Sequence, residues 1–402
     1  MEQTYFRRGF GLRGQIAGAL TADYHSRVVD QIRQRGYAFS VGDLTFKLAR
    51  EFGFCYGVDR AVEYAYEART KFPDRRIYLV GEIIHNPHVN NKLHAMDVQV
   101  LHRLDGGEFD VSAVTPADVV ILPAFGVTVK DFERLRSIGC VLVDTTCGSV
   151  LNVWKRVESY AKDGFTAIIH GKYYHEETKA TSSQVTKYAG GQFVVVRDMA
   201  EAREVCDYVE GAGERERFLQ RFAHKLAPGF DPDRDFVRVG VANQTTMLSN
   251  ESLAIAAELR RSVAKRYGEA AVADHFRTFD TICSATQDRQ DAVLKLIAEP
   301  LDLMVVIGGY NSSNTTHLAA ICTAKVPSYH IEDAACIDPA AGTIRFLPVG
   351  AKVEQRREGW LATGPLTIGV TAGASTPNNK IGETIERIAA ARGLTLEAAL
   401  GG

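Results

Sequence analysis

The sequence predicts an α/β protein made of parallel sheets whose faces are covered by helices. Seven short apolar runs each end in glycine or a small polar residue, and helical periodicity follows them. Strand, tight loop and helix in repeated order are typical of parallel sheets. The repetition favours several small α/β units over one large sheet, although no strict sequence period is present. The runs span residues 76–86, 119–128, 140–149, 165–175, 236–246, 303–314 and 366–376.

The length of 402 residues fits about two to four units. Predicted boundaries lie near residues 42, 146 and 284. The charged segment 206–235 predicts a helical insertion and a surface loop. The expected parts are an N-terminal extension (1–41), three α/β domains (42–146, 147–283 and 284–385) and a C-terminal helix and tail (386–402).

The composition excludes several classes of partner. Lys and Arg total 47 against 49 Asp and Glu, a net charge of −2, so no global field attracts nucleic acid or a membrane surface. No apolar run approaches the roughly 18 residues of a spanning helix. The seven cysteines are odd in number and no secretory leader precedes them, which favours a reducing compartment over a disulfide framework.

Two short motifs resemble known sites but lack an essential part. Gly9–Gly14 reads G-x-G-x-x-G, yet the eight residues before it include Arg7 and Arg8, so no buried strand feeds the turn. His175–Lys179 begins like the zinc-protease helix H-E-x-x-H, but Lys179 stands where the second histidine is required. Both interpretations are rejected.

Three cysteines share one context, the turn between a strand and a helix. Cys55, Cys147 and Cys283 each open a helical pattern; Cys55 lies in the first expected domain, Cys147 begins the second, and Cys283 ends it directly before the third. Helix N-termini favour thiolate, and three thiolates leave one metal position open for substrate. The alternative, that all seven cysteines are small buried apolar residues, stays open on spacing alone. The cysteines within strand or helix patterns, expected in the core, are Cys140, Cys206, Cys322 and Cys336.

Polar residues also gather at the ends of the predicted strands. Ser, Thr and Asn cap helices everywhere, so capping explains any one of them. Together they are typical of a phosphate cradle of N–H groups, hydroxyls and imidazoles. They are His85, His170, His175, Glu177, Asn243, Thr245, Thr246, Ser312, Ser313, Asn314 and Ser375.

Eight motifs in order make the sequence resemble the 4-hydroxy-3-methylbut-2-enyl diphosphate reductase family of the non-mevalonate isoprenoid pathway. The motifs are FGFCYGVDRAV, IIHN, DTTC, HGKYYHEET, NQTT, TICSATQDRQDAV, GGYNSSNTTHL and GVTAGAS. The resemblance covers roughly residues 45 to 380. The N-terminal extension and the 206–235 insertion resemble the plant and cyanobacterial branch.

The resemblance implies three α/β domains around one 4Fe–4S cluster, held by Cys55, Cys147 and Cys283. It implies that the fourth iron is open and takes the substrate's hydroxyl oxygen. Glu177 matches the acid that delivers a proton, and Thr245 matches its hydroxyl neighbour. The substrate contacts match His85, His175, Thr245, Ser312, Ser313, Asn314 and Ser375.

The family's activity removes an allylic hydroxyl with two electrons and two protons and yields isopentenyl and dimethylallyl diphosphate. The resemblance implies electrons from a ferredoxin or flavodoxin. It also implies a cytoplasmic location in a bacterium or a plastid location in a plant. No nucleic-acid or membrane partner is expected, and the oligomeric state is left open.

Two positions depart from the family pattern. Phe125 replaces the histidine of an Ala-His-Gly triplet, which removes one imidazole, and Gly148 replaces the proline after the second cysteine.

Three other hypotheses about the function remain. Quinolinate synthase shares one cysteine per α/β unit, although the NSSN and TAGAS motifs argue against it. The other two hypotheses are a non-catalytic iron–sulfur redox sensor and a clusterless sugar- or nucleotide-binding protein.

Overall fold

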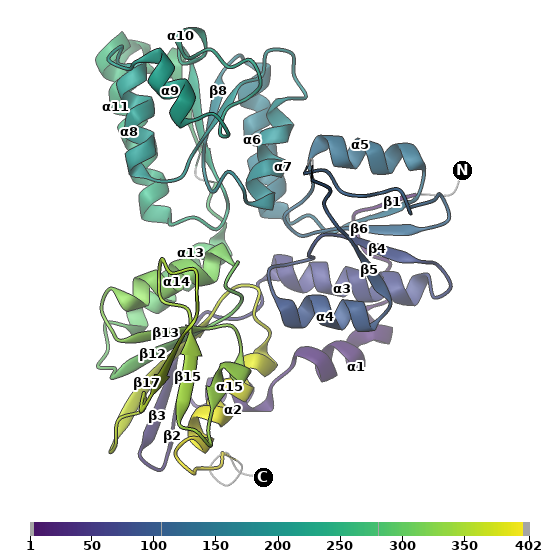
Figure 1. The fold of residues 1–402 in the computed structure, drawn as a ribbon, viewed down its shortest axis with the longest axis vertical. Helices are drawn as coiled ribbons and strands as arrows, with labels where there is room; N and C mark the ends of the chain where they lie inside the picture. The colour runs from purple at the N-terminus through teal and green to yellow at the C-terminus, as the bar shows by residue number, and fades with distance from the viewer. Residues whose placement is uncertain (1–3, 106, 280, 397–402) are drawn as a thin grey trace. The chain divides into compact units, whose positions relative to one another are not determined.

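All seven apolar runs form parallel strands in the structure, a computed structural model that describes residues 4–105, 107–279 and 281–396. The predicted α/β class with several parallel sheets is therefore confirmed (Figure 1). The strands are β4 (Ile77–Val80), β6 (Val119–Leu122), β7 (Val141–Asp144), β8 (Thr166–His170), β10 (Val239–Asn243), β12 (Leu303–Ile307) and β17 (Leu366–Ala372).

The chain divides into two units, each made of separate stretches of sequence. The predicted boundaries near residues 42, 146 and 284 remain a prediction. Residues 1–3 of the predicted extension and 397–402 of the predicted tail lie outside the described residues. The first unit comprises Met1–Arg8, Asp74–Ile83 and Val98–Cys283, and the second comprises Gly9–Pro73, Ile84–Asp97 and Ser284–Gly402.

The first unit contains a five-stranded parallel sheet in the order β1-β7-β6-β4-β5. The short strand β1 (Tyr5–Phe6) brings the N-terminal segment to this sheet, where it pairs with β7. Strand β5 (Val98–Leu101) forms the other edge. Helix α5 (Val129–Ile138) packs Leu135 into the same apolar core as β6 and β7, because both strands are buried and, apart from Asp144 at the end of β7, apolar.

A second parallel sheet of the first unit has the order β11-β10-β8-β9. Alternating residues face opposite sides, so Ala167 and Ile169 of β8 pack with α6 and α7, whereas Ile168 packs with α8 and α11. The remaining elements are β9 (Phe193–Val196), β11 (Phe276–Thr278), α6 (Gly148–Lys162), α7 (Glu176–Val185), α8 (Met199–Val209), α9 (Arg215–Arg221), α10 (Pro232–Asp235), α11 (Ser249–Tyr267), the 3-10 turn η1 (Glu269–Ala271) and α12 (Val272–His275).

The sheet of the second unit has the order β13-β12-β17-β3-β2. Strands far apart in the sequence lie side by side here, as the purple β3 and yellow-green β17 in Figure 1 show. Helices α2 and α15 share one core with this sheet, and α13 and α14 share another. The elements are α1 (Arg13–Tyr24), α2 (Arg27–Gln34), β2 (Ala38–Val41), β3 (Leu44–Leu48), α3 (Tyr56–Lys71), α4 (Pro87–Ala95), α13 (Ser284–Leu296), α14 (Ser313–Thr323), β13 (Ser328–Ile331) and α15 (Asn378–Ala390).

The second unit also carries a small antiparallel sheet that the apolar pattern did not predict. Its order is β14-β15-β16, with strands Ile337–Asp338, Thr343–Phe346 and Gln355–Glu358 preceded by the 3-10 turn η2 (Ala334–Cys336). Within the described residues, no helix is both long enough and apolar enough to cross a membrane.

Candidate active site

Three cysteines differ from the other four in position and exposure. Cys55 is the N-cap residue of α3, Cys147 is that of α6, and Cys283 directly precedes α13; all three are partly exposed. The other four are buried, and burial raises the pKa of Cys140 to about 11 and that of Cys322 to about 12. The helix-start thiols are therefore the ones suited to ligate a metal, because ligation requires thiolate.

The two units divide these three cysteines between them. Cys147 and Cys283 lie in the first unit and Cys55 in the second. No three His, Cys, Asp or Glu side chains among the described residues form a group that could hold a metal ion. The convergence of the three thiols therefore stays a prediction.

Each cysteine is tied through its main chain to another loop that the sequence singled out. The acceptors belong to the Ala124-Phe125-Gly126 triplet, the NQTT motif and the TAGAS motif. These bonds fix the start of each cysteine's helix against the carboxyl end of a neighbouring strand, where ligands of α/β sheets bind. The main-chain N–H groups donate from Cys55 to Ala374 (3.2 Å), from Cys147 to Ala124 (2.8 Å) and from Cys283 to Thr245 (3.4 Å).

The first unit brings Glu177 and Thr245 together, although 68 positions separate them in the sequence. Glu177 is only 3% exposed in the first turn of α7. Its Oε1 accepts the Thr245 main-chain N–H at 2.6 Å, and its Oε2 lies 3.0 Å from the Thr245 hydroxyl. A buried carboxyl with both oxygens held is suited to keep or release a proton at a defined atom.

His175 is the N-cap residue of α7 and contacts the main chain of Glu177. Its Nδ1 accepts the Glu177 main-chain N–H at 3.1 Å, so the neutral ring carries its proton on Nε2. The ring of Phe125 contacts that of His175 edge to face, with centroids 6.2 Å apart. Phe125, the middle residue of the Ala124-Phe125-Gly126 triplet, thus packs against an imidazole that the sequence predicts in the site.

Gln244 joins the NQTT loop to the segment 170–178, and it was not among the residues predicted from the sequence. Its Oε1 accepts the Lys172 N–H at 3.2 Å and lies 3.1 Å from the Thr178 hydroxyl, and its own N–H donates to the His170 carbonyl at 2.8 Å. Gly171 allows this approach, since a Cβ there would lie 2.8 Å from the Thr178 Oγ1. The sequence signal for Gln244 is its place inside the NQTT motif, between Asn243 and Thr245, which were both predicted.

Three of the polar residues at strand ends have structural partners. His170 is fully buried, and its Nδ1 lies 2.7 Å from the hydroxyl of Ser252 on α11. The Asn243 Nδ2–H donates to the Gln244 carbonyl at 3.1 Å, and its Oδ1 accepts the Thr281 hydroxyl. The Thr246 hydroxyl accepts the Gln244 Nε2–H at 2.8 Å. These contacts account for their polarity without a ligand.

The second unit contains most of the predicted substrate contacts, whereas His175 and Thr245 lie in the first unit. Ser312 is the N-cap residue of α14, and Ser313, Asn314 and Ser375 are also more than 90% buried. Asn314 Oδ1 accepts the Ala374 N–H at 2.8 Å, whereas its buried Nδ2 has no hydrogen-bond partner among the described residues. A buried unpaired donor at a helix N-terminus is suited to an anion.

His85 lies beside the same loop. Its carbonyl accepts the Ser375 hydroxyl at 3.1 Å, and its Nδ1 accepts the Asn311 Nδ2–H at 3.4 Å. Gly309 passes so close that a Cβ would lie 2.8 Å from the His85 carbonyl oxygen. His85, Ser375 and the 309–314 loop therefore form one group of donors in this unit.

A buried guanidinium supports the loop that carries Cys55. Arg289 of α13 is 4% exposed, and its Nη2 donates to the Gly53 carbonyl at 2.7 Å while its Nη1 donates to that of Ala285 at 2.8 Å. Arg289 lies inside the TICSATQDRQDAV motif, but no role was predicted for it from the sequence. Its contact links the helix that follows Cys283 in the sequence to the segment before Cys55.

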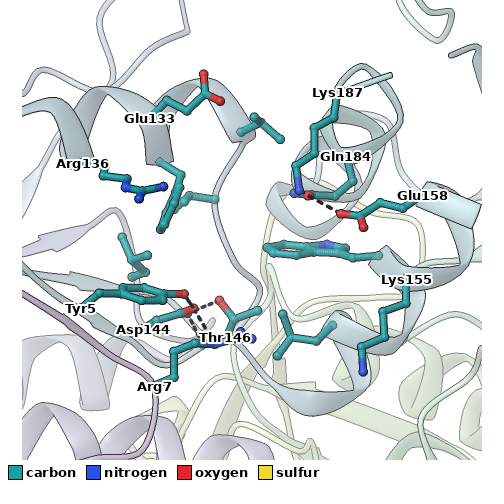
Figure 2. Close-up of a pocket in the computed structure, with 16 residues that line it drawn as sticks. Tyr5, Arg7, Glu133, Arg136, Asp144, Thr146, Lys155, Glu158, Gln184 and Lys187 are labelled. Carbon is teal, nitrogen blue, oxygen red and sulfur yellow. Dashed lines mark hydrogen bonds and ion pairs between the residues drawn. The ribbon is translucent and has the colours of Figure 1, made fainter. Parts of the chain in front are cut away.

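A cavity of about 520 Å³ lies in the first unit, and none of the predicted site residues lines it. Figure 2 shows Tyr5, Arg7 and Thr146 directed toward the buried carboxylate of Asp144. The Tyr5 hydroxyl donates to Asp144 at 2.6 Å, Arg7 Nε lies 3.5 Å away, and the Thr146 N–H donates at 2.9 Å. Asp144 in the cavity wall thus holds Thr146, the residue that precedes Cys147.

Residues 46–389 match the family model described as LytB protein. A relative from Thermosynechococcus vestitus, named 4-hydroxy-3-methylbut-2-enyl diphosphate reductase, is 49% identical over 391 residues, which cover 97% of this chain and 95% of the relative. A relative of the same name from Gloeobacter violaceus is 47% identical over 403 residues, covering 99% of this chain and 95% of the relative.

A solved structure is similar along most of the chain. It is a (E)-4-hydroxy-3-methyl-but-2-enyl diphosphate reductase, described as the terminal enzyme of the non-mevalonate pathway. It is 27% identical with a TM-score of 0.52, and the match covers 85% of this chain and 98% of that one.

Proposed function

The chain belongs to the LytB family, and on that premise we propose that it reduces 4-hydroxy-3-methylbut-2-enyl diphosphate to isopentenyl diphosphate and dimethylallyl diphosphate, the last step of the non-mevalonate pathway. The reaction takes up two electrons and two protons and releases the hydroxyl group as water. Within the structure, the observation that carries the proposal is the buried carboxyl of Glu177 held by Thr245.

Cys55, Cys147 and Cys283 are proposed to hold one 4Fe–4S cluster. Their partial exposure and their places at helix starts fit thiolate ligands, whereas the four buried thiols do not. A bound cluster with three protein ligands supplies electrons one at a time and one open iron position.

Glu177 is proposed as the group that delivers a proton to the departing oxygen, because hydroxide is a poor leaving group. Its Oε1 faces a main-chain N–H, which donates in every protonation state. The exchangeable proton therefore belongs on Oε2, where the Thr245 hydroxyl either donates or accepts. Thr245 orients this proton and provides a second route for it.

The diphosphate is proposed to bind at the start of α14. The unpaired Asn314 Nδ2 provides a buried donor, and the helix N-terminus adds main-chain N–H groups and the positive end of the dipole. His175 offers its Nε2–H from the first unit. The full set of proposed substrate contacts is His85, His175, Thr245, Ser312, Ser313, Asn314 and Ser375.

A ferredoxin or a flavodoxin is proposed as the electron donor, since the reaction needs two electrons delivered singly. The test compares turnover with reduced ferredoxin, reduced flavodoxin and NADPH alone. Turnover with either protein and none with NADPH is expected, and equal turnover with NADPH would contradict this choice.

The proposed reaction is tested by anaerobic assay of the iron-loaded protein with dithionite, a viologen and the allylic diphosphate. Consumption of the substrate with formation of both five-carbon diphosphates is expected. A fully loaded protein that forms neither product would overturn the proposal and favour a redox sensor.

A further inference from the structure

The small antiparallel sheet of the second unit reaches the proposed diphosphate loop through one carboxylate. Glu354 lies directly before β16, and its Oε1 accepts the Tyr310 hydroxyl at 2.6 Å. Its Oε2 accepts the Arg345 Nη1–H from β15 at 2.8 Å. Both oxygens are thus engaged, one by the sheet and one by the loop.

Tyr310 is held on two further sides. Its ring contacts that of His330 edge to face at 5.1 Å, and its hydroxyl lies 3.7 Å from the sulfur of buried Cys336. Burial, more than the Glu354 hydrogen bond, raises the pKa of Tyr310, so the phenol keeps its proton and donates it. A single orientation of the hydroxyl satisfies Glu354.

His330 also holds the loop at Gly308, two residues before Tyr310. The pKa of His330 is lowered to about 4, chiefly by burial, so the ring is neutral and its Nε2–H donates to the Gly308 carbonyl at 2.9 Å. Gly308 has a φ of +144°, and a Cβ there would lie 2.5 Å from the Thr376 hydroxyl. The backbone at Gly308 has therefore little freedom to move.

Tyr310 is two residues from the helix start that the diphosphate is proposed to use. The Ser312 N–H donates to the Gly309 carbonyl at 3.0 Å, and the Ser312 Oγ accepts the Thr315 N–H at 3.4 Å to cap α14. A shift of Tyr310 is transmitted directly to Ser312, because this turn spans the residues between them.

We infer that Tyr310 and Glu354 form a positioning pair that sets the 308–314 loop for the diphosphate and so governs substrate affinity. The inference rests on the proposed function. Neither residue belongs to the proposed substrate contacts, and neither moves a proton in the reaction.

Arg345 supports the Tyr310–Glu354 pair by offsetting the negative charge of Glu354. A carboxylate near an anion site repels the anion, and Arg345 offsets that charge. Removing the guanidinium therefore weakens binding even though Tyr310 keeps its partner. Arg345→Lys restores the charge and is expected to recover most of the affinity lost in Arg345→Gln.

The test measures kcat, KM and iron content for Tyr310→Phe, Glu354→Gln and the double variant. Tyr310→Phe removes the hydrogen bond without changing the charge and is expected to raise KM about tenfold, the usual worth of one hydrogen bond to a charged group, with kcat and iron content within about twofold of the parent. Glu354→Gln keeps an oxygen that accepts the Tyr310 hydroxyl and removes a charge that repels the anion, so it is expected to change KM less. The double variant is expected to have a KM no higher than that of Tyr310→Phe, because the hydrogen bond is already absent there.

Tyr329→Phe is the matched control, since it removes the hydroxyl of a buried tyrosine on β13 whose ring packs against Phe346 and Trp360. It is expected to leave KM unchanged. Unchanged KM in Tyr310→Phe would overturn the inference, as would a parallel fall of kcat, iron content and melting temperature, which marks a structural role alone.

Calorimetric binding of inorganic pyrophosphate to the same proteins separates this inference from the proposed function. Weaker binding by about tenfold in Tyr310→Phe supports the positioning pair even where the parent protein fails to reduce the substrate. Equal binding by parent and variant overturns the pair even where the parent protein is fully active.

Discussion

Glu177 and Thr245 meet through two contacts, 2.6 Å from the Thr245 N–H to Oε1 and 3.0 Å between the Thr245 hydroxyl and Oε2. The first contact is fixed by the backbone, whereas the second works with either partner as donor. The carboxyl group is thus held in one orientation through a change of its charge, as a proton donor requires.

Replacing Glu177 by glutamine is expected to abolish turnover while the site keeps its shape. The amide oxygen takes the Thr245 N–H and the amide nitrogen faces the Thr245 hydroxyl, but no transferable proton remains. A fall in kcat of about 100- to 10,000-fold is predicted, with iron content and substrate affinity retained. Single-turnover kinetics with dithionite measure it.

The neighbouring Glu176→Gln variant is the control. Glu176 pairs with Arg103 and Lys179 at the surface of α7, so its loss is expected to cost at most about 1 kcal/mol of stability and little activity. Near-normal turnover by Glu177→Gln would contradict the proposed role of Glu177 as the proton donor.

Asn314→Asp tests the buried donor at the start of α14. Aspartate still accepts the Ala374 N–H but places a negative oxygen where Nδ2 stands. Facing like charges cost several kcal/mol, so KM is expected to rise by about 100-fold or more. Asn250→Asp adds the same charge at an exposed position of the other unit and is expected to leave KM unchanged.

Arg289→Lys tests the support of the Cys55 loop. A lysine keeps the charge but lacks the fork that binds both Gly53 and Ala285. A loss of about 1–3 kcal/mol in stability is expected, together with faster alkylation of Cys55 in the metal-free protein. Lys295→Gln, at an exposed position of the same helix, should change neither melting temperature nor alkylation rate.

His330 predicts a dependence of stability on pH. Burial lowers its pKa to about 4 in the folded protein, against about 6.5 in an unfolded chain. The unfolded state therefore binds the proton first, and stability falls as the pH drops from about 6.5 toward 4. The loss between pH 7 and pH 5 is about 2 kcal/mol.

The measurement compares the melting temperature of the parent protein with that of His330→Gln at pH 7 and pH 5. The variant is less stable at pH 7, since it loses the Gly308 contact, but its melting temperature should fall less on acidification. Equal falls in both proteins would exclude His330 as the source.

The strands were predictable where burial alone decides the sequence. Leu303–Ile307 is buried along its whole length and wholly apolar, so no other element fits it. β16 was missed because Gln355–Glu358 is exposed throughout and shows no alternation of apolar and polar residues. Glu354, which precedes it, was missed for the same reason.

Helix starts were predictable where a residue follows a buried strand, as Cys147 and Ser312 do. Gln244 and Arg289 act instead through main-chain atoms of segments remote in the sequence; Arg289 reaches across 236 positions to Gly53. Such partners leave no local pattern, so only the folded chain reveals them.

Iron and acid-labile sulfide, measured with the visible spectrum on anaerobically prepared protein, test the three-cysteine site most directly. The parent protein and Cys140→Ser are predicted to hold about four iron atoms per chain, as a 4Fe–4S centre requires. Cys55→Ser, Cys147→Ser and Cys283→Ser are each predicted to lose most of the iron and the absorbance. Parental iron content in any of these three variants, or loss of iron in Cys140→Ser, would contradict the assignment.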